Sequence, residues 1–339
     1  MKSKIVVLLI VGFAIAAGVS SYYGRANLAK ELNAKMVYVP VTADSIGITT
    51  MPILLNPSDP KQTTVGELRY VEGWELTSEN EDFGGWSGLV KKNTGLLAIS
   101  DKGNWLETTQ DVSPANTTID GNVSLFDPSV IEADKSDYDA ESLVALPDGY
   151  LVGFEQEHRL LKVSKLGATA ELYDTGVDLS GLSSNSGIEA MTLLPNGDLL
   201  MFAESGRSTS GQTPAWLVSG DNHYSIEFYP PENYEATDAA ALPGGDVLLL
   251  MRYYSLLTGA SAQVRHITAA EIKSGVIRGR QIAEIKEPLN VDNMEGLDVQ
   301  FLPDGTVRLF LISDDNFSSR QRTLFMVFDW KPDQKLVAH

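Results

Sequence analysis

The sequence predicts an all-β fold, and three observations support this prediction. Pro-x-Gly turns recur at a nearly fixed interval: those at Pro147, Pro195 and Pro243 are 48 residues apart, and the next begins at Pro303. Short apolar segments alternate with turn residues along the chain. After Lys35 no helix longer than a short turn near Ala269 is expected. Repetition of one unit with this period is typical of propellers and solenoids.

The repeated unit is a hairpin whose two strands differ in composition. Its five copies begin at Trp86, Glu141, Ile188, Thr237 and Asn293. The first strand is rich in small residues, such as Ser87 and Gly88, which suits strands that crowd around a central axis. The second strand is almost continuously apolar, as expected when neighbouring units cover both of its faces.

Two further strands are expected after each of the three middle hairpins. They are predicted at Arg159 to Val163, Thr169 to Tyr173, Ala215 to Val218, Tyr224 to Phe228, Gln263 to Ile267 and Gln281 to Ile285. Four strands in about 48 residues is the size of a propeller blade. The predicted fold is therefore a β-propeller of four-stranded blades.

The two ends of the domain are expected to close the ring together. The last repeat supplies a third strand, Leu324 to Trp330, and the sequence then nearly ends. Glu67 to Leu76, near the beginning, can provide the missing outer strand of that blade. This arrangement gives five blades, or six if Lys35 to Leu55 contributes further strands.

The chain divides into three predicted parts. Residues 1–26 resemble an export signal, because Lys2 and Lys4 precede the apolar run from Ile5 to Val19, which is short for a membrane span. Cleavage is favoured over retention as an N-terminal anchor, and either outcome predicts a periplasmic or secreted protein. Residues 27–63 are predicted to be an irregular linker, and residues 64–335 the propeller domain.

The composition excludes several classes of partner and site. The formal net charge of -19 repels nucleic-acid phosphates and anionic lipid, so membrane contact is expected only through an uncleaved N-terminal segment. The chain has no cysteine, which excludes thiol nucleophiles and zinc–thiolate sites. We expect a monomer whose partner is a small anionic ester bound by local cationic groups; alternatively, the acidity only maintains solubility.

Superposition of the repeats produces two columns of charged residues. The start of the first strand gives Ser87, Glu141, Glu189, Asp238 and Glu295, and the end of the second strand gives Asp101, Glu155, Glu204, Arg252 and Asp314. Because a hairpin joins the two positions, both columns should meet at one mouth of the propeller axis. Carboxylates gathered there repel one another unless they are protonated, paired with arginine or neutralised by a cation, and Ca²⁺ accepts such hard oxygen ligands.

A structural role is the alternative for each of these residues. An acidic side chain at a strand start can accept backbone hydrogen bonds from the next blade, and the run of Asp134, Asp137, Asp139 and Glu141 is expected to be a solvated loop. Basic residues follow the same columns: His158, Arg159, Arg207, Arg252, Arg320 and Arg322. They would pair with the acidic ring or bind an anionic substrate, and internal pairing is favoured for Arg252.

Several segments together resemble the phytase-like family, described by its esterase-like activity of the phytase type. They are Phe83–Leu89 (FGGWSGL), Asp139–Ser142 (DAES), Phe154–Leu160 (FEQEHRL), Asn185–Met191 (NSGIEAM), Val291–Leu297 (VDNMEGL), Ser313–Phe317 (SDDNF) and Gln321–Thr323 (QRT). The resemblance runs from about Gly66 to Trp330 and implies a secreted β-propeller and a metal-assisted hydrolase of phosphoric or other esters. The chain departs from the family at Met251, where an acidic residue is usual, and at Ser142, where glycine is usual.

The first functional hypothesis is a calcium-dependent hydrolase of a phosphate ester. The predicted metal ligands are Glu141, Glu189, Asp238, Glu295, Asp314 and Asp315. The predicted catalytic residues are Glu141, Glu189, Glu295 and His158, and the predicted substrate-binding residues are Arg159, Arg207, Arg252 and Arg322. The alternatives are a propeller lactonase or carboxylic esterase, and a non-catalytic binding or scaffold protein whose ring carboxylates are structural.

Overall fold

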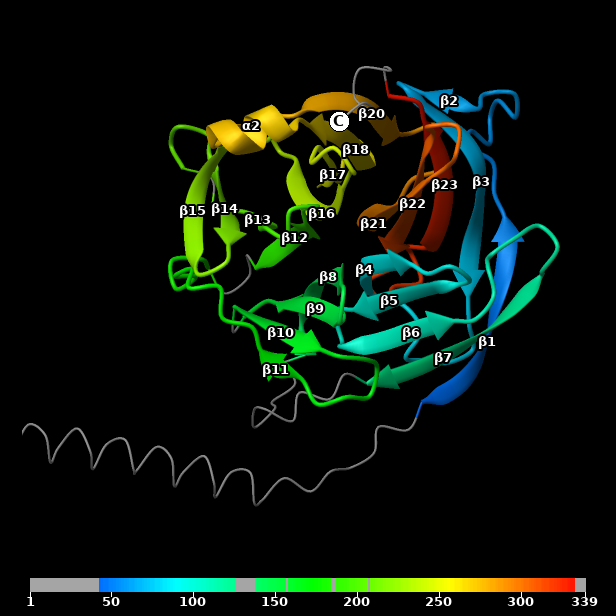
Figure 1. The fold of residues 1–339 in the computed structure, drawn as a ribbon. Helices are drawn as coiled ribbons and strands as arrows, with labels where there is room; N and C mark the ends of the chain where they lie inside the picture. Colours follow the sequence, from blue (N-terminus) through cyan, green and yellow to red (C-terminus); the bar gives the residue numbers. More distant parts are fainter. Residues whose placement is uncertain (1–42, 126–137, 157, 184–186, 207, 333–339) are drawn as a thin grey trace, which may run out of the picture. The chain divides into compact units, whose positions relative to one another are not determined.

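The computed structural model describes residues 43–125, 138–156, 158–183, 187–206 and 208–332, which form five antiparallel blades around a central axis (Figure 1). The innermost strand of each blade contacts the innermost strands of the two neighbouring blades, so that the five close into a ring. The prediction of a β-propeller is thus confirmed, and of the two blade counts that it left open, five and six, the structure has five. The predicted export signal lies outside the described residues, and no described helix is long and apolar enough to cross a membrane.

Each blade is named here by its order along the chain, and its strands are given from the axis outward. Blade 1 contains β4 (Trp86–Lys91), β5 (Leu96–Ser100), β6 (Asn104–Thr108) and β7 (Thr118–Leu125). Blade 2 contains β8 (Ala140–Leu146), β9 (Gly149–Phe154), β10 (Arg159–Val163) and β11 (Glu171–Leu172). Blade 3 contains β12 (Ile188–Leu193), β13 (Leu199–Ala203), β14 (Thr213–Ser219), β15 (Asn222–Phe228) and the short parallel β19 (Val276–Ile277).

The last two blades complete the ring. Blade 4 contains β16 (Glu235–Ala241), β17 (Val247–Ser255), β18 (Gly259–Ile267) and β20 (Arg280–Lys286). Blade 5 contains β21 (Asn293–Phe301), β22 (Val307–Asp314), β23 (Thr323–Trp330) and β3 (Leu68–Thr77), against which the two-residue β2 (Thr64–Val65) pairs.

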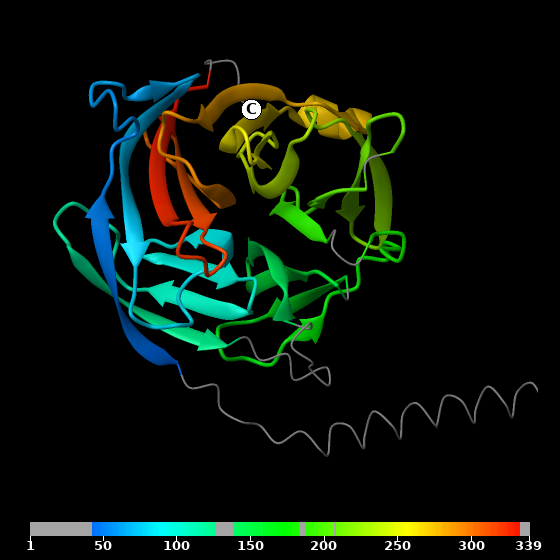
Figure 2. The same ribbon diagram turned by 180° about the vertical axis from the view of Figure 1, so that it is seen from behind.

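The N-terminal part of the domain supplies the outer strand of the last blade, as predicted. β3 pairs antiparallel with β23, from Thr323 opposite Leu76 to Trp330 opposite Leu68. Figures 1 and 2 show these two strands side by side from both directions, although 245 residues lie between Thr77 and Thr323 in sequence. Ring closure therefore depends on pairing between the two ends of the domain.

One strand corrects the assignment of residues 27–63 as an irregular linker. β1 (Asp44–Pro52) pairs with both β3 and β7, and it joins blades 5 and 1 along the outside of the ring. Only Ile46, Ile48 and Thr50 point inward, in strict alternation with exposed residues. So few inward residues make the strand pattern weak in the sequence. The strand adds to blades 5 and 1 and does not begin a sixth blade.

The core explains why the second strand of each blade is apolar on both faces. Leu249 packs in a cluster shared by blades 3 and 4, whereas its neighbour Leu250 packs in one shared by blades 4 and 5. Leu200 and Met201 divide in the same way between the clusters on either side of blade 3. Since successive strand residues point to opposite faces, both faces must be hydrophobic when a blade lies on each side.

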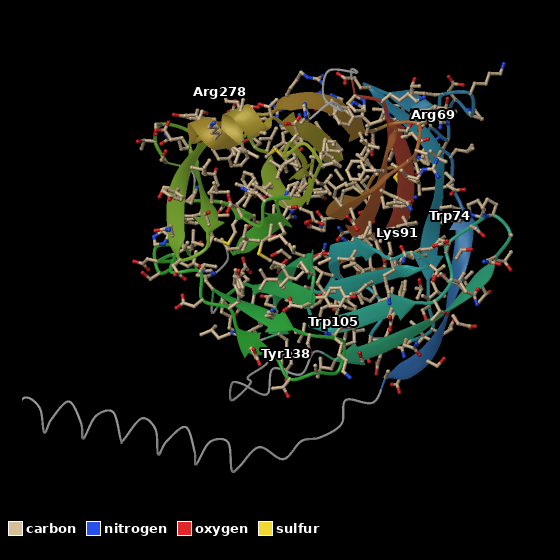
Figure 3. All side chains as sticks on the ribbon, in the orientation of Figure 1. Arg69, Trp74, Lys91, Trp105, Tyr138 and Arg278 are labelled. Atoms are coloured by element: carbon tan, nitrogen blue, oxygen red, sulfur yellow. The ribbon has the colours of Figure 1, made fainter. Side chains whose placement is uncertain are left out.

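Large aromatic side chains fill the wider outer parts of these interfaces. Figure 3 labels Trp74 on β3 and Trp105 on β6, which are 1% and 2% exposed. Trp74 stacks on Phe325 and Trp105 packs against Tyr150 of the next blade. Aromatic side chains on the outer strands therefore help to fill the core within and between blades.

Small residues allow the inner strands to approach closely, as the sequence predicted. A Cβ atom on Gly88 would lie 2.7 Å from Cβ of Leu143 in blade 2, and one on Gly296 would lie 2.9 Å from Cβ of Leu89 in blade 1. These distances are too short for any side chain, so glycine is required at both positions.

The single described helix, α2 (Ala269–Ser274), matches the short turn expected near Ala269. Thr268 caps its N-terminus, where the side chains of Thr268 and Glu271 each accept a hydrogen bond from the backbone N–H of the other. Gly275 ends it in the left-handed conformation. The helix follows β18 and leads into β19, and it takes no part in the site described next.

Candidate functional site: an acidic ring

Every inner strand is interrupted by a β-bulge near its start. The register shifts between Trp86 and Gly88, Ala140 and Ser142, Ile188 and Ala190, Ala236 and Asp238, and Met294 and Gly296. The residues that bulge out of the pairing are therefore Ser87, Glu141, Glu189, Thr237 and Glu295. Bulges redirect side chains and are common beside active sites. We call the end of the inner strands that carries them the mouth.

The ends of the second strands lie at the same mouth. Phe154 pairs with Ala140 and Ala203 pairs with Ile188, so Glu155 and Glu204 follow directly beside the bulges. Arg252 and Asp314 pair with the first residues of their inner strands in the same way. The two columns seen in the sequence thus meet, and we call their members, with Asp139, the acidic ring. The ring consists of Asp101, Asp139, Glu141, Glu155, Glu189, Glu204, Glu295, Asp314 and the embedded Arg252.

Asp238 does not belong to this ring. The bulged residue of β16 is Thr237, so the sequence superposition was displaced by one position in this blade. The Asp238 carboxylate is 1% exposed and accepts hydrogen bonds from the backbone N–H of Ala239, at 2.8 Å, and of Leu297 in blade 5, at 2.6 Å. Its position is that of a blade-to-blade staple, which the sequence analysis named as the alternative.

Asp315 also holds structure together at a short distance from the ring. Its Oδ1 accepts hydrogen bonds from the N–H groups of Gly85 and Phe317, both at 3.0 Å, and its Oδ2 accepts one from the Thr323 hydroxyl at 3.0 Å. All three donors are protein groups. These contacts tie the loop after β22 to the loop before β4 across the junction of blades 5 and 1.

Two overlapping triads of carboxylates are the densest part of the ring. Asp139, Glu141 and Glu155 each place an oxygen within 4.8 Å of the others, and Glu155, Glu189 and Glu204 do the same. Glu155 is shared by both triads. Its Oε1 also accepts a hydrogen bond from the N–H of Gly187, at 3.2 Å, which fixes it between blades 2 and 3.

Arg252 is the counter-charge on the other side of the ring. Its Nη2 lies 2.8 Å from Glu204 Oε1, its Nε lies 3.2 Å from Glu295 Oε1, and its Nη1 donates to Asn293 Oδ1 at 3.1 Å. The nearby carboxylates, Glu295 first, raise the pKa of the guanidinium further above its usual value. Arg252 therefore pairs with ring carboxylates, which is the role that the sequence favoured for it.

Burial and the nearby carboxylates hold the pKa values of several ring carboxyl groups above their ordinary range. Burial raises the pKa of Glu155 to about 7 and that of Asp101 to about 7, and nearby carboxylates contribute. Burial raises the pKa of Glu295 to about 8 although Arg252 opposes the shift. Burial, followed by the charge of Glu189, raises the pKa of Glu141 well above its usual value. At neutral pH the ring therefore stores repulsion that a bound cation would relieve.

The other predicted substrate-binding residues are engaged elsewhere or lie outside the description. Arg159 is 8% exposed and lies over the ring of Phe154, 5.0 Å from its centroid. Arg322 lies beside Asp292 and donates to Asn290 Oδ1 at 3.2 Å. His158, in the β9–β10 turn, has a buried Nδ1 without a hydrogen-bond partner among the described residues. Arg207 lies outside the described residues.

Asp139 is the ring member that the sequence analysis placed in a solvated loop. It precedes β8 by one residue, its carbonyl accepts a hydrogen bond from the N–H of Glu155 at 2.8 Å, and its Oδ2 accepts one from Gln156 at 2.7 Å. Its neighbours in the acidic run, Asp134 and Asp137, lie outside the described residues. In the sequence, the place of Asp139 two residues before Glu141, at the start of a predicted strand, could have indicated that both belong to the ring.

Replacing Asp238 tests whether it is a staple. Asp238→Ala should lower the free energy of unfolding by about 1–3 kcal/mol, because two buried N–H groups lose their acceptor. The loss should be the same with calcium and with a chelator in urea unfolding experiments. A loss that appears only in the presence of calcium would instead make Asp238 a metal ligand.

The comparisons with known proteins give one family and several distant structures. A family model described as "Phytase-like: Esterase-like activity of phytase" matches residues 81–317, which is more than half of the chain. No curated protein matches. This match is consistent with the segments quoted from the sequence, and the family description supports a hydrolase.

Solved structures that resemble the chain have low identity. A glutaminyl cyclase from Myxococcus xanthus has a TM-score of 0.44 and 13% identity, covering 78% of this chain and 97% of that one. The PQQ-bound aldose sugar dehydrogenase from Streptomyces coelicolor has a TM-score of 0.47 and 10% identity, covering 79% and 99%. The allergen Mala s 1 from Malassezia sympodialis has a TM-score of 0.42 and 12% identity, covering 86% and 97%. None of these similarities bears on activity.

Proposed function

The chain belongs to the phytase-like family, and from this premise we propose that it is an exported calcium-dependent hydrolase of phosphoric or related esters. The observation that carries the proposal is the pair of carboxylate triads that share Glu155 at the mouth. The proposed site is the acidic ring as a whole.

The chemistry of the donor set fits calcium. The triads offer only carboxylate oxygens, and Ca²⁺ accepts 6 to 8 oxygen ligands in flexible geometry. No cysteine or paired histidine is available to favour a softer metal among the described residues. Asp139, Glu141 and Glu155 would hold one ion, and Glu155, Glu189 and Glu204 are the neighbouring donor group. A calcium ion bound there would polarise an ester oxygen and lower the pKa of an attacking water.

Protein side chains around the triads set the charge that a substrate meets. Arg252 pairs with Glu204, a member of the second triad, whereas Asp139, Glu141 and Glu155 of the first triad have no ion pair to arginine or lysine among the described residues. A cation is therefore expected first at that triad. Glu189 of the second triad is buried, at 4% exposed.

A carboxylic ester or lactone is the second candidate substrate class. The observation that favours it is the engagement of the described arginines: Arg159 lies against Phe154, Arg252 pairs with Glu204 and Glu295, and Arg322 lies beside Asp292. A phosphate ester usually receives an arginine fork, whereas a lactone does not need one. The two classes are separated by their hydrolysis rates on a common leaving group.

Glu155→Gln is the variant that tests the proposed function. It removes one charge from both triads, and we expect the ester-hydrolysis kcat/KM to fall at least about 100-fold and the calcium concentration for half-activation to rise. The assay compares p-nitrophenyl phosphate with p-nitrophenyl acetate in calcium and in EDTA. Glu171→Gln, an equal charge change on the exposed β11, should behave like the wild type. Full activity of Glu155→Gln would refute the site, and calcium-dependent stability without turnover of any ester would assign the carboxylates a structural role.

A further inference from the structure

One hairpin extends beyond the acidic ring. β17 has nine residues, whereas the corresponding second strands β5, β9, β13 and β22 have five, six, five and eight, and β22 ends at the ring member Asp314. Its last three residues, Tyr253 to Ser255, continue past Arg252, a ring member, and remain paired with β18 as far as Gly259. At about 3.3 Å per residue, the hairpin rises roughly 10 Å above Arg252. Figure 1 shows β17 and β18 beside β16 in blade 4.

The tip of this hairpin is apolar and fully open to solvent. Leu256 and Leu257 are 92% and 97% exposed, the highest values among the exposed large hydrophobic residues, and Tyr254 is 63% exposed. Two adjacent leucines are not stabilised by such a position, because each leaves most of its apolar surface in water. We call Tyr254, Leu256 and Leu257 the apolar tip.

The hairpin below the tip is well supported. The hydroxyls of Ser255 and Thr258 lie 2.7 Å apart, and the Ser255 hydroxyl accepts a hydrogen bond from the N–H of Thr258 at 3.1 Å. Tyr253 packs against Tyr234, with ring centroids 5.7 Å apart, and the Tyr234 hydroxyl contacts Ser261 Oγ at 2.7 Å. The tip is thus presented by a braced turn, which reduces the entropy lost when an apolar group binds to it.

The charge of the ring limits which substrates can lie beneath the tip. Eight carboxylates and one arginine form the ring, and Arg252 is already paired. Even with a divalent cation in place, such a ring keeps a net negative charge, so it repels a densely phosphorylated molecule much more strongly than a molecule with a single anionic or acyl group. The apolar tip therefore belongs to the same end of the molecule as a site that favours substrates with few negative charges.

We propose that the apolar tip binds the hydrophobic portion of the substrate, so that the substrate is an aryl or alkyl ester with a single anionic or acyl group and not a polyphosphorylated polyol. This inference rests on the proposed function and specifies its substrate class. The ester group lies at the acidic ring, and its apolar substituent packs on Leu256 and Leu257. The acidic surface of the chain disfavours an anionic lipid surface as the occupant.

The test compares Leu256→Ser/Leu257→Ser with the wild type on two kinds of ester. The wild type should hydrolyse 1-naphthyl phosphate with a higher kcat/KM than inositol hexakisphosphate or glycerol 2-phosphate. The double variant should lose about tenfold in kcat/KM on the naphthyl ester, as expected when about one leucine contact is lost, and retain its rate on glycerol 2-phosphate. Leu172→Ser, at a 63% exposed leucine of β11, is the matched control and should retain both rates.

A binding measurement separates this inference from the proposed function. Calorimetric titration with 1-naphthylphosphonate in calcium should give about tenfold weaker binding to the double variant than to the wild type, whether or not any ester is hydrolysed. Unchanged binding and unchanged ester preference would overturn the role of the tip. So would a loss confined to binding of neutral phosphatidylcholine vesicles or to self-association in sedimentation, because either would give the tip a different occupant. Absence of turnover with intact tip-dependent binding would refute only the hydrolase.

Discussion

Chelating calcium is expected to lower the melting temperature by about 5–10 °C at pH 8 and to change it little at pH 5. The physical reason is the set of ring carboxyl groups whose pKa values lie above their ordinary range in the folded protein, among them Asp101 and Glu155 at about 7 and Glu295 at about 8. At pH 8 Asp101 and Glu155 are largely ionised and Glu295 is about half ionised, so they repel one another without a cation, whereas at pH 5 all three are protonated. The shift assumes about 2–4 °C per kcal/mol, as for single domains of similar or smaller size.

The sign of the pH effect follows from proton linkage. A carboxyl group with a raised pKa binds more protons in the folded than in the unfolded state between its ordinary pKa of about 4 and its folded pKa. The calcium-free protein should therefore lose stability as the pH rises from about 4 to 8, by up to about 1.4 kcal/mol per pH unit for each such group. Thermal unfolding scans in EDTA and in calcium across this range measure it. A calcium-free protein that becomes more stable between pH 5 and 8 would contradict this description of the ring.

Removing the arginine of the ring is expected to have a comparably large effect. Arg252→Met should lower the free energy of unfolding at pH 8 by about 3–5 kcal/mol, because Glu204 and Glu295 lose their ion-pair partner within a buried cluster. Methionine retains most of the apolar contact of the side chain, so the loss reports charge more than volume. Urea unfolding in calcium-free buffer is the measurement.

A second variant identifies the source of that loss. Adding Glu295→Gln to Arg252→Met should restore part of the stability, since glutamine removes the charge that Arg252 had neutralised. The deficit of the single variant should also shrink at pH 5, where Glu295, with a pKa of about 8, is protonated. Equal deficits at both pH values, with no recovery in the double variant, would indicate lost packing as the cause.

The sequence predicted the architecture because the buried strands of the core appear as apolar runs at a regular interval along the chain. Strands such as β13 are buried on both faces, so each repeat shows an unbroken apolar run after a Pro-x-Gly turn. The closing strand β3 was predicted for the same reason, because the last blade lacked an outer partner. β1 was missed because its three inward residues, Ile46, Ile48 and Thr50, give too short a pattern to distinguish it from a linker.

The site was predicted in outline but not in register. A β-bulge adds one residue to a strand without a sequence signature, and in β16 the bulged residue is Thr237, so Asp238 was aligned with Glu141 although it points to blade 5. The role of Asp139 depends on how the chain enters β8, which an acidic run alone does not show. Internal pairing of Arg252 was predicted, but its partners Glu204 and Glu295 were not named, since an arginine among several carboxylates can pair with any of them.

The location of bound calcium tests the central claim most directly. Crystals grown with calcium and phosphate, and measured near an X-ray energy at which calcium scatters anomalously, should show an anomalous peak between Asp139, Glu141 and Glu155, with Glu155 also facing Glu189. A peak absent from both triads at millimolar calcium, with the carboxylates hydrogen-bonded to one another in protonated form, would contradict the account.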